Sequence, residues 1–148
     1  MRIAIGSDQN TDLTEAIIFD LESRGIELNR FGALIDNRQG NWPIVAENVA
    51  RDVSEGSATQ GILFCYTGTG VSIVANKFAG VRAALCVDAE TARGARMWND
   101  ANVLCMSIRL TSIEVGHEIV DHWLSTIQID ESEKSNIEKI TNLDRRLQ

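Results

Sequence analysis

Residues 61–76 read GILFCYTGTGVSIVAN, and this stretch decides the fold of the 148-residue chain. Its first five residues form an apolar run without a polar break, which is typical of a strand buried on both faces, and its last eight have the composition of a helix. Between them lies a glycine-rich turn, Tyr66-Thr67-Gly68-Thr69-Gly70. Such a turn points several unpaired backbone N–H groups and the positive end of a helix dipole at one small volume. We expect that volume to hold an anion or a developing oxyanion.

Cys65 is the last residue of this predicted strand, at the rim of the turn. A thiol beside a helix N-terminus is often more acidic than a free one, and a thiolate there can act as a base or a nucleophile. The alternative is that Cys65 is a small core residue, as cysteine often is. Cys86 and Cys105 lie in other apolar runs, and we expect both in the core.

Four more apolar runs predict strands, and the stretches between them predict helices. Leu13, Ile17 and Leu21 recur at helical spacing, Gly25 suits the position after that helix, and Pro43 suits the first turn of the next one. The predicted strands cover residues 2–6, 26–31, 61–65, 81–86 and 103–107. The predicted helices cover residues 11–24, 43–54, 69–76, 88–97, 112–126 and 131–145.

This alternation of buried strands and helices predicts an α/β fold, a parallel five-stranded sheet with helices on both faces. In such a sheet the ligand lies outside the carboxyl ends of the strands, at the switch in strand order. With the order 2-1-3-4-5, the switch falls between strands one and three, so the turns at Asp8 and Cys65 face each other. Asp8 is then a candidate substrate ligand, and its alternative role is a helix cap.

Composition limits the class of protein further. A length of 148 residues predicts one domain, residues 1–148, and the net charge of −7 disfavours nucleic acids and anionic membranes as partners. Without a signal peptide or an apolar stretch long enough to span a membrane, we expect a cytoplasmic protein. The three cysteines have no CxxC spacing, which indicates neither a disulfide framework nor a metal site.

Several stretches resemble the ribose-5-phosphate isomerase B and galactose-6-phosphate isomerase (RpiB/LacAB) family. They are IAIGSD at 3–8, GILFC at 61–65, TGTG at 67–70, ANKFAGVRAALC at 75–86, NDANVL at 99–104 and IVDHWL at 119–124. The resemblance implies a Rossmann-like fold, a homodimer or dimer of dimers with active sites across the interface, and no metal or cofactor. It also implies the interconversion of aldose and ketose phosphates through a cis-enediolate.

The resemblance assigns roles to individual residues. Cys65 falls on the base that moves a proton between C1 and C2, and Thr67 falls on a hydroxyl that assists at the substrate oxygens. Asp8 matches an aspartate that contacts the sugar during ring opening. Asn99 matches a ligand of substrate oxygens, and Arg109 matches an arginine that binds phosphate. The turn around Gly68 and Gly70 resembles the family's anion hole.

Other residues depart from the family pattern. Gln9 stands in place of a histidine, Tyr66 in place of a glycine, Trp98 in place of the histidine credited with ring opening, and Trp42 in place of an aromatic that is usually tyrosine. Near the C-terminus, two phosphate-binding arginines are missing from the segment that contains Ser132, Glu133 and Asn136. We therefore expect a substrate other than ribose 5-phosphate. The missing arginines indicate an unphosphorylated sugar or one whose anion sits elsewhere, and the missing histidine indicates a short or already open chain, such as a tetrose or a keto-sugar derivative.

The leading hypothesis is an aldose–ketose isomerase, with Cys65, Thr67 and Asp8 as catalytic residues and a sugar or sugar phosphate as substrate. Two alternatives are a weakly active or inactive scaffold subunit that pairs with an active paralogue, and a module that binds a small sugar. We expect the last two helices, residues 112–145, to pack on a neighbouring subunit. The predicted substrate-binding residues are Gln9, Trp42, Tyr66, Gly68, Thr69, Gly70, Ser72, Trp98, Asn99 and Arg109.

Overall fold

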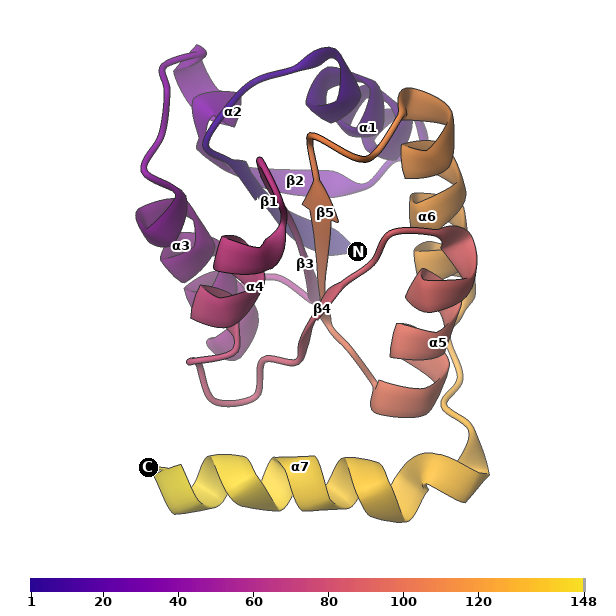
Figure 1. Ribbon diagram of the computed structural model, residues 1–148. Helices are drawn as coiled ribbons and strands as arrows, with labels where there is room; N and C mark the ends of the chain where they lie inside the picture. Colours follow the sequence, from indigo (N-terminus) through magenta and orange to yellow (C-terminus); the bar gives the residue numbers. More distant parts are fainter. Residues whose placement is uncertain (148) are drawn as a thin grey trace.

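A computed structural model describes residues 1–147 as a parallel five-stranded sheet between two layers of helices (Figure 1). The predicted three-layer α/β architecture is confirmed; residue 148 of the predicted domain lies outside the described part. The strands are β1 (Arg2–Ser7), β2 (Glu27–Gly32), β3 (Gln60–Cys65), β4 (Ala83–Leu85) and β5 (Val103–Ser107). The helices are α1 (Asp12–Ser23), α2 (Ala33–Asp36), α3 (Trp42–Ser54), α4 (Thr69–Ala75), α5 (Ala89–Asn99), α6 (Ile113–Ser125), the 3₁₀ turn η1 (Glu131–Glu133) and α7 (Lys134–Leu147).

Alternate residues of the strands supply two separate cores. Ile3 and Ile5 of β1 face one core, which α1, α5 and α6 cover, whereas Ala4 faces the other, which α3 and α4 cover. Both faces of β3 are fully buried, which explains why residues 61–65 are apolar without a polar break. No described helix has the combination of length and apolar composition that crossing a membrane requires.

The predicted order of the last two strands is wrong. The order is β2-β1-β3-β5-β4, so β5 pairs with β3 and β4 lies at the edge of the sheet. All five residues of β5 are buried, whereas the three residues of β4 are only half-buried, which suits a central and an edge strand respectively. In this register Cys65 lies opposite Ser107, so the ends of β3 and β5 stand side by side.

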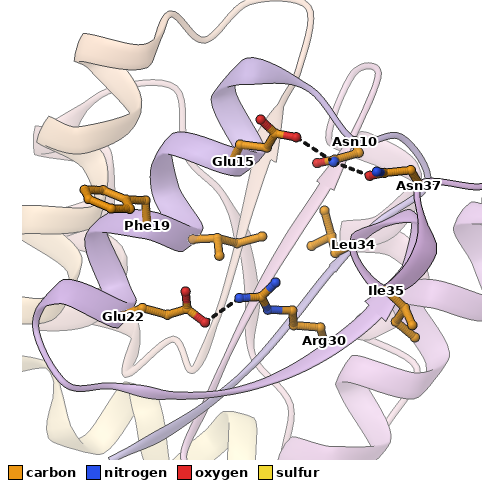
Figure 2. Close-up of a pocket in the computed structure, with 9 residues that line it drawn as sticks. Asn10, Glu15, Phe19, Glu22, Arg30, Leu34, Ile35 and Asn37 are labelled. Atoms are coloured by element: carbon orange, nitrogen blue, oxygen red, sulfur yellow. Dashed lines mark hydrogen bonds and ion pairs between the residues drawn. The ribbon is translucent and has the colours of Figure 1, made fainter.

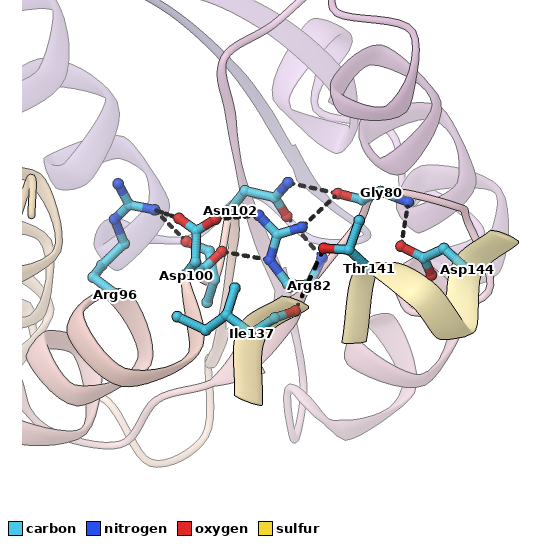
Figure 3. A network of polar contacts seen from close by, with 9 residues as sticks. Gly80, Arg82, Arg96, Asp100, Asn102, Ile137, Thr141 and Asp144 are labelled. Carbon is cyan, nitrogen blue, oxygen red and sulfur yellow. Dashed lines mark hydrogen bonds and ion pairs between the residues drawn. The ribbon is translucent and has the colours of Figure 1, made fainter. Parts of the chain in front are cut away.

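A polar network explains the ANKFAGVRA and NDANVL motifs (Figure 3). The Arg82 guanidinium donates to the Asp100 carboxylate at 2.8 Å, and the Arg82 backbone N–H donates to the Asn102 side chain at 2.8 Å. The Asn76 side-chain NH₂ donates to the Ala83 carbonyl at 2.8 Å, and its Oδ1 accepts from the Ala83 N–H at 2.9 Å. Asn76 thereby satisfies backbone groups on the free side of edge strand β4. These motif residues therefore join the loops before β4 and β5 and have a structural role.

Helix α6 packs within its own chain. Ile119, Val120 and Trp123 are fully buried in the core under α1 and α5, and the Trp123 indole N–H donates to Gln60 at 2.7 Å. The inner face of α6 is therefore occupied by its own chain, and packing of the last two helices on a neighbouring subunit stays a prediction for their other faces. Helix α7, in contrast, lies across the end of the sheet where the strands begin (Figure 1).

Candidate active site

The thiol of Cys65 receives a hydrogen bond from the turn that follows it. The backbone N–H of Gly68 donates to Cys65 Sγ at 3.2 Å, and the side chain is 6% exposed. An N–H donor aimed at sulfur favours negative charge on that atom. Cys65 is thus the end of a rigid strand, with a donor already in place for a thiolate.

Position 68, at the start of helix α4, accepts only glycine. Its φ of 75° lies in the left-handed region, and a Cβ there would lie 2.5 Å from Leu85 Cδ1 and 3.0 Å from the backbone of Met106. The turn therefore sits directly on strands β4 and β5. Beside it, the hydroxyls of Thr67 and Thr69 share a hydrogen bond of 2.7 Å, so these two predicted site residues lie together.

Trp42 reaches the turn from the start of helix α3. A Cβ on Gly70 would lie 3.0 Å from the Trp42 ring, so the indole packs on the glycine backbone. The loop before α3 is held at the end of β1 by a hydrogen bond of 2.8 Å from Gly40 N–H to the Asp8 carbonyl. Trp42 therefore lies beside the glycine turn, between the ends of β1 and β3, and its contact with substrate stays a prediction.

Asp8 follows β1 and is 8% exposed, and its Oδ1 is buried without a hydrogen-bond partner in the described part of the chain. Burial raises the pKa of the Asp8 carboxyl above its ordinary value, and a hydrogen bond from its own backbone N–H opposes the shift. The alternative of a helix cap is wrong, because Thr11 caps helix α1. The neighbouring Gln9 is bound through its backbone to the Ser7 hydroxyl, at 2.6 and 3.2 Å.

Arg109 lies on the loop after β5. Its backbone N–H donates to the Tyr66 carbonyl at 3.1 Å, which brings this predicted phosphate ligand to the glycine turn. Ser107 completes the same contact with a hydroxyl that donates to the Tyr66 carbonyl at 2.9 Å. Sequence reasoning missed Ser107; the only signal was a polar residue closing an apolar strand.

The other cysteines lie in the core, as predicted. Burial raises the pKa of the Cys86 thiol to about 12, with the Asp88 carboxylate as a second cause. Burial also raises the pKa of Cys105, and a hydrogen bond from Ser72 opposes this. Ser72 therefore lies beside a core thiol, and its predicted contact with substrate stays a prediction.

Trp98 and Asn99 lie away from this site within one chain. They end helix α5, just before the start of β5, whereas Cys65 ends β3. The end of α5 lies where the strands of the sheet begin, far from the ends of β3 and β5 (Figure 1). The Trp98 ring packs on Gly94, and the Arg93 guanidinium lies 5.3 Å from its centroid. A single chain therefore brings the predicted residues that follow β1, end or follow β3, follow β5 and begin α3 and α4 to one end of the sheet, but not those at the end of α5.

A separate pocket lies between α1, β2 and α2 (Figure 2). Its polar groups already have partners: Arg30 pairs with Glu22, and the Asn10 amide donates to Glu15 at 2.9 Å and to Asn37 at 2.5 Å. None of the predicted catalytic or substrate-binding residues lines it. This pocket is therefore separate from the predicted site at the strand ends.

The substitution Asp8→Asn should raise the free energy of unfolding at pH 7 by about 1 kcal/mol. The folded-state pKa of Asp8 lies above the unfolded value near 3.8, so the folded protein holds this proton more tightly. The resulting destabilisation is absent below the unfolded pKa, grows as pH rises through the folded pKa and is constant above it. Urea titrations should therefore show the gain at pH 7 and not at about pH 3.

Asp130→Asn is the matched control, because the Ser132 contacts lower the pKa of that carboxylate. The expected change in the free energy of unfolding has the opposite sign: removal of this charge should lower stability at pH 7. An equal gain for Asp8→Asn at both pH values would show that burial of the charge is not the cause.

Comparisons with known proteins agree on one family. The profile of the family described as Ribose/Galactose Isomerase matches residues 3–140. Ribose-5-phosphate isomerase B of Escherichia coli (strain K12) is 37% identical over 146 residues, which are 98% of this chain and 97% of the relative. The solved structure of Clostridium thermocellum ribose-5-phosphate isomerase B superposes with a TM-score of 0.92 at 35% identity, and the match covers 100% of both chains.

Two relatives carry names that refer to four-carbon sugars. The D-erythrulose-4-phosphate isomerase of Pectobacterium atrosepticum is 36% identical, with 84% of this chain and 82% of the relative covered. The 4-deoxy-4-sulfo-D-erythrose isomerase of Clostridium sp. (strain MSTE9) is 35% identical, with 85% and 80% covered. From the nearly complete coverage and the shared fold, the chain belongs to the ribose/galactose isomerase family of sugar-phosphate isomerases.

Proposed function

We propose that this protein is an aldose–ketose isomerase that works through a cis-enediolate, with Cys65 as the base. The observation that carries the proposal is the Gly68 N–H···Sγ hydrogen bond at the end of β3, which provides a thiolate site beside the glycine turn. Asp8, Trp42 and Arg109 converge on the same strand ends from three other segments. The proposed reaction needs no metal or cofactor.

The chemistry follows from this arrangement. The Cys65 thiolate takes the proton from C2 of the open-chain aldose, and the electron pair of that C–H bond forms the enediolate. The same thiol returns the proton to C1, while a proton moves between the two oxygens to give the ketose. The Thr67 hydroxyl and the turn N–H groups stabilise the charge on oxygen, a contribution of about 3–4 kcal/mol per donor.

For the substrate we propose a four-carbon sugar with an acidic group. The Arg109 backbone is bonded to the turn, so its guanidinium is the cation that we propose for the acidic group. Ser132, Glu133 and Asn136 occupy the segment where the family resemblance leads one to expect further arginines. Trp98 cannot move a proton as the histidine credited with ring opening does, and a four-carbon sugar that bears its acid on C4 cannot close a five- or six-membered ring. The relatives that act on erythrulose 4-phosphate and sulfoerythrose support this size.

An isomerase assay in deuterated water should therefore show turnover of four-carbon sugar phosphates or sulfonates and only weak turnover of ribose 5-phosphate. Free sugars of four to six carbons are the control for the need of an acidic group. Deuterium incorporation detects proton transfer even without net conversion. Ribose 5-phosphate turnover with kcat/KM above about 10⁴ M⁻¹ s⁻¹ would contradict the proposed substrate.

We also propose that a second copy of the chain completes the site. Tyr66, Val87 and Leu110 follow β3, β4 and β5 and are 57%, 53% and 70% exposed, so large apolar side chains are exposed at the end of the sheet that holds Cys65. Helix α7 makes few contacts with the rest of its chain, and Leu143 on it is 54% exposed. A partner that covers these surfaces also brings its Trp98 and Asn99 toward the Cys65 edge.

Light scattering at micromolar concentration should give a dimer or tetramer of the 16.3 kDa chain. Leu143→Glu, which places a charge on the exposed face of α7, should shift the protein toward monomer and reduce activity together. Glu138→Lys, an exposed charge change on the same helix, is the control. A wild-type mass of 16.3 kDa would rule out the shared site.

The three unpaired cysteines fit a reducing compartment, so we place the reaction in the cytoplasm.

A further inference from the structure

Ser107 is a buried hydroxyl that binds the segment next to the base. It ends β5 opposite Cys65 and is 1% exposed. Its Oγ donates to the Tyr66 carbonyl at 2.9 Å and accepts from the Leu110 N–H at 3.2 Å. The hydroxyl therefore acts as donor and as acceptor, and it joins the glycine turn to the Arg109 loop.

Two backbone hydrogen bonds run parallel to this contact. The Ile108 N–H donates to the Cys65 carbonyl at 3.0 Å, and the Arg109 N–H donates to the Tyr66 carbonyl at 3.1 Å. The Tyr66 carbonyl thus accepts hydrogen bonds from both the Ser107 hydroxyl and the Arg109 N–H. Tyr66 lies between Cys65 and Gly68, whose N–H contacts Cys65 Sγ. The segment 65–68 and the loop 107–110 are consequently held as one unit.

We propose that Ser107 is a positioning residue for the isomerisation proposed above, on which this inference rests. By fixing the Tyr66 carbonyl, its hydroxyl sets the orientation of the turn that places the Gly68 N–H against Cys65 Sγ. Through the same carbonyl it sets where the Arg109 loop lies relative to the thiol. Proton transfer and anion binding need both groups at a fixed separation, since small misplacements cost large factors in rate.

Amide hydrogen exchange tests the contact without any substrate. Ser107→Ala should speed hydrogen exchange at the Arg109 and Gly68 N–H groups by about fivefold to tenfold. This factor corresponds to the free energy of one lost hydrogen bond. Ser54→Ala is the matched control, because the Ser54 hydroxyl also donates to a distant carbonyl, that of Ala79, at 2.8 Å. Unchanged exchange at both amides in Ser107→Ala, relative to the control, would overturn the proposal.

Steady-state kinetics test the positioning role. Ser107→Ala should lower kcat and raise KM, each by about fivefold, whereas Ser54→Ala should change neither. In an Arg109→Ala background, Ser107→Ala should still lower kcat but no longer raise KM, because its effect on KM acts through Arg109. A Ser107→Ala variant with a lower melting temperature but wild-type kcat and KM would refute the positioning role.

If the wild type isomerises no sugar, the proposed function fails, and inorganic phosphate replaces the substrate in the same comparison. Ser107→Ala should then weaken phosphate binding about fivefold in the wild-type background and not in Arg109→Ala. Equal phosphate affinity of Ser107→Ala and wild type would show that the hydroxyl does not position Arg109.

Discussion

Cys65→Ser should exchange substrate protons 10²–10⁴ times more slowly than the wild type, a factor on the order of what general-base catalysis supplies. Serine keeps the shape of cysteine, but a hydroxyl is a far weaker acid than a thiol, so the variant lacks the proposed thiolate base at the atom that receives the Gly68 N–H. Folding stability should change little, because the Gly68 N–H can donate to the serine oxygen as well. The measurement is deuterium incorporation into substrate.

Cys86→Ala is the matched control, since it removes a buried thiol that donates to the Ala84 carbonyl, and it should leave exchange unchanged. Iodoacetamide near neutral pH adds a second readout. Cys65 should react first and bound substrate should protect it, because burial raises the pKa of Cys86 to about 12 and also raises that of Cys105.

Slow alkylation of Cys65 together with unchanged exchange in Cys65→Ser would end its assignment as the base. Wild-type protein that binds sugars without exchanging protons would instead support a scaffold subunit or a sugar-binding module.

Gly68→Ala should lower the free energy of unfolding by about 2–5 kcal/mol and remove most activity. The new Cβ would be strained at a φ of 75° and would lie 2.5 Å from Leu85 Cδ1 and 3.0 Å from the Met106 backbone. The leucine end can move, but the backbone of central strand β5 cannot, so the turn must shift. Its N–H then leaves Cys65 Sγ.

Gly25→Ala separates backbone strain from close atomic contact as the cause of the lost stability. Gly25 has a similar φ of 73° with no atom within 4 Å of a new Cβ, so alanine there incurs only the backbone strain, about 1 kcal/mol. Urea denaturation of both variants gives the difference, which measures the contact with Leu85 and Met106. Equal losses in the two variants would show that the turn does not depend on this close packing.

Local patterns in the sequence determined most individual elements. The apolar run at 61–65 became β3, Pro43 lies in the first turn of α3, and Gly25 follows α1 with positive φ. Each of these signals depends on neighbours within one or two turns of chain: burial on both faces, a missing N–H, or a left-handed residue. The same holds for Cys65 and its glycine turn, which are contiguous in the chain.

The tertiary structure alone decided which segments meet. Strand order is set by pairing between distant residues, so nothing local in residues 81–86 and 103–107 revealed that β5 pairs with β3. That pairing places Ser107 beside Cys65, and packing likewise places the Trp42 ring on Gly70 and Asp8 away from the cap of α1. The sequence predicted Trp98 and Asn99 as site residues, but only the fold showed that α5 ends where the strands begin, away from Cys65. Elements follow from short-range chemistry, whereas the assembly of this site follows from long-range contacts that short-range patterns do not encode.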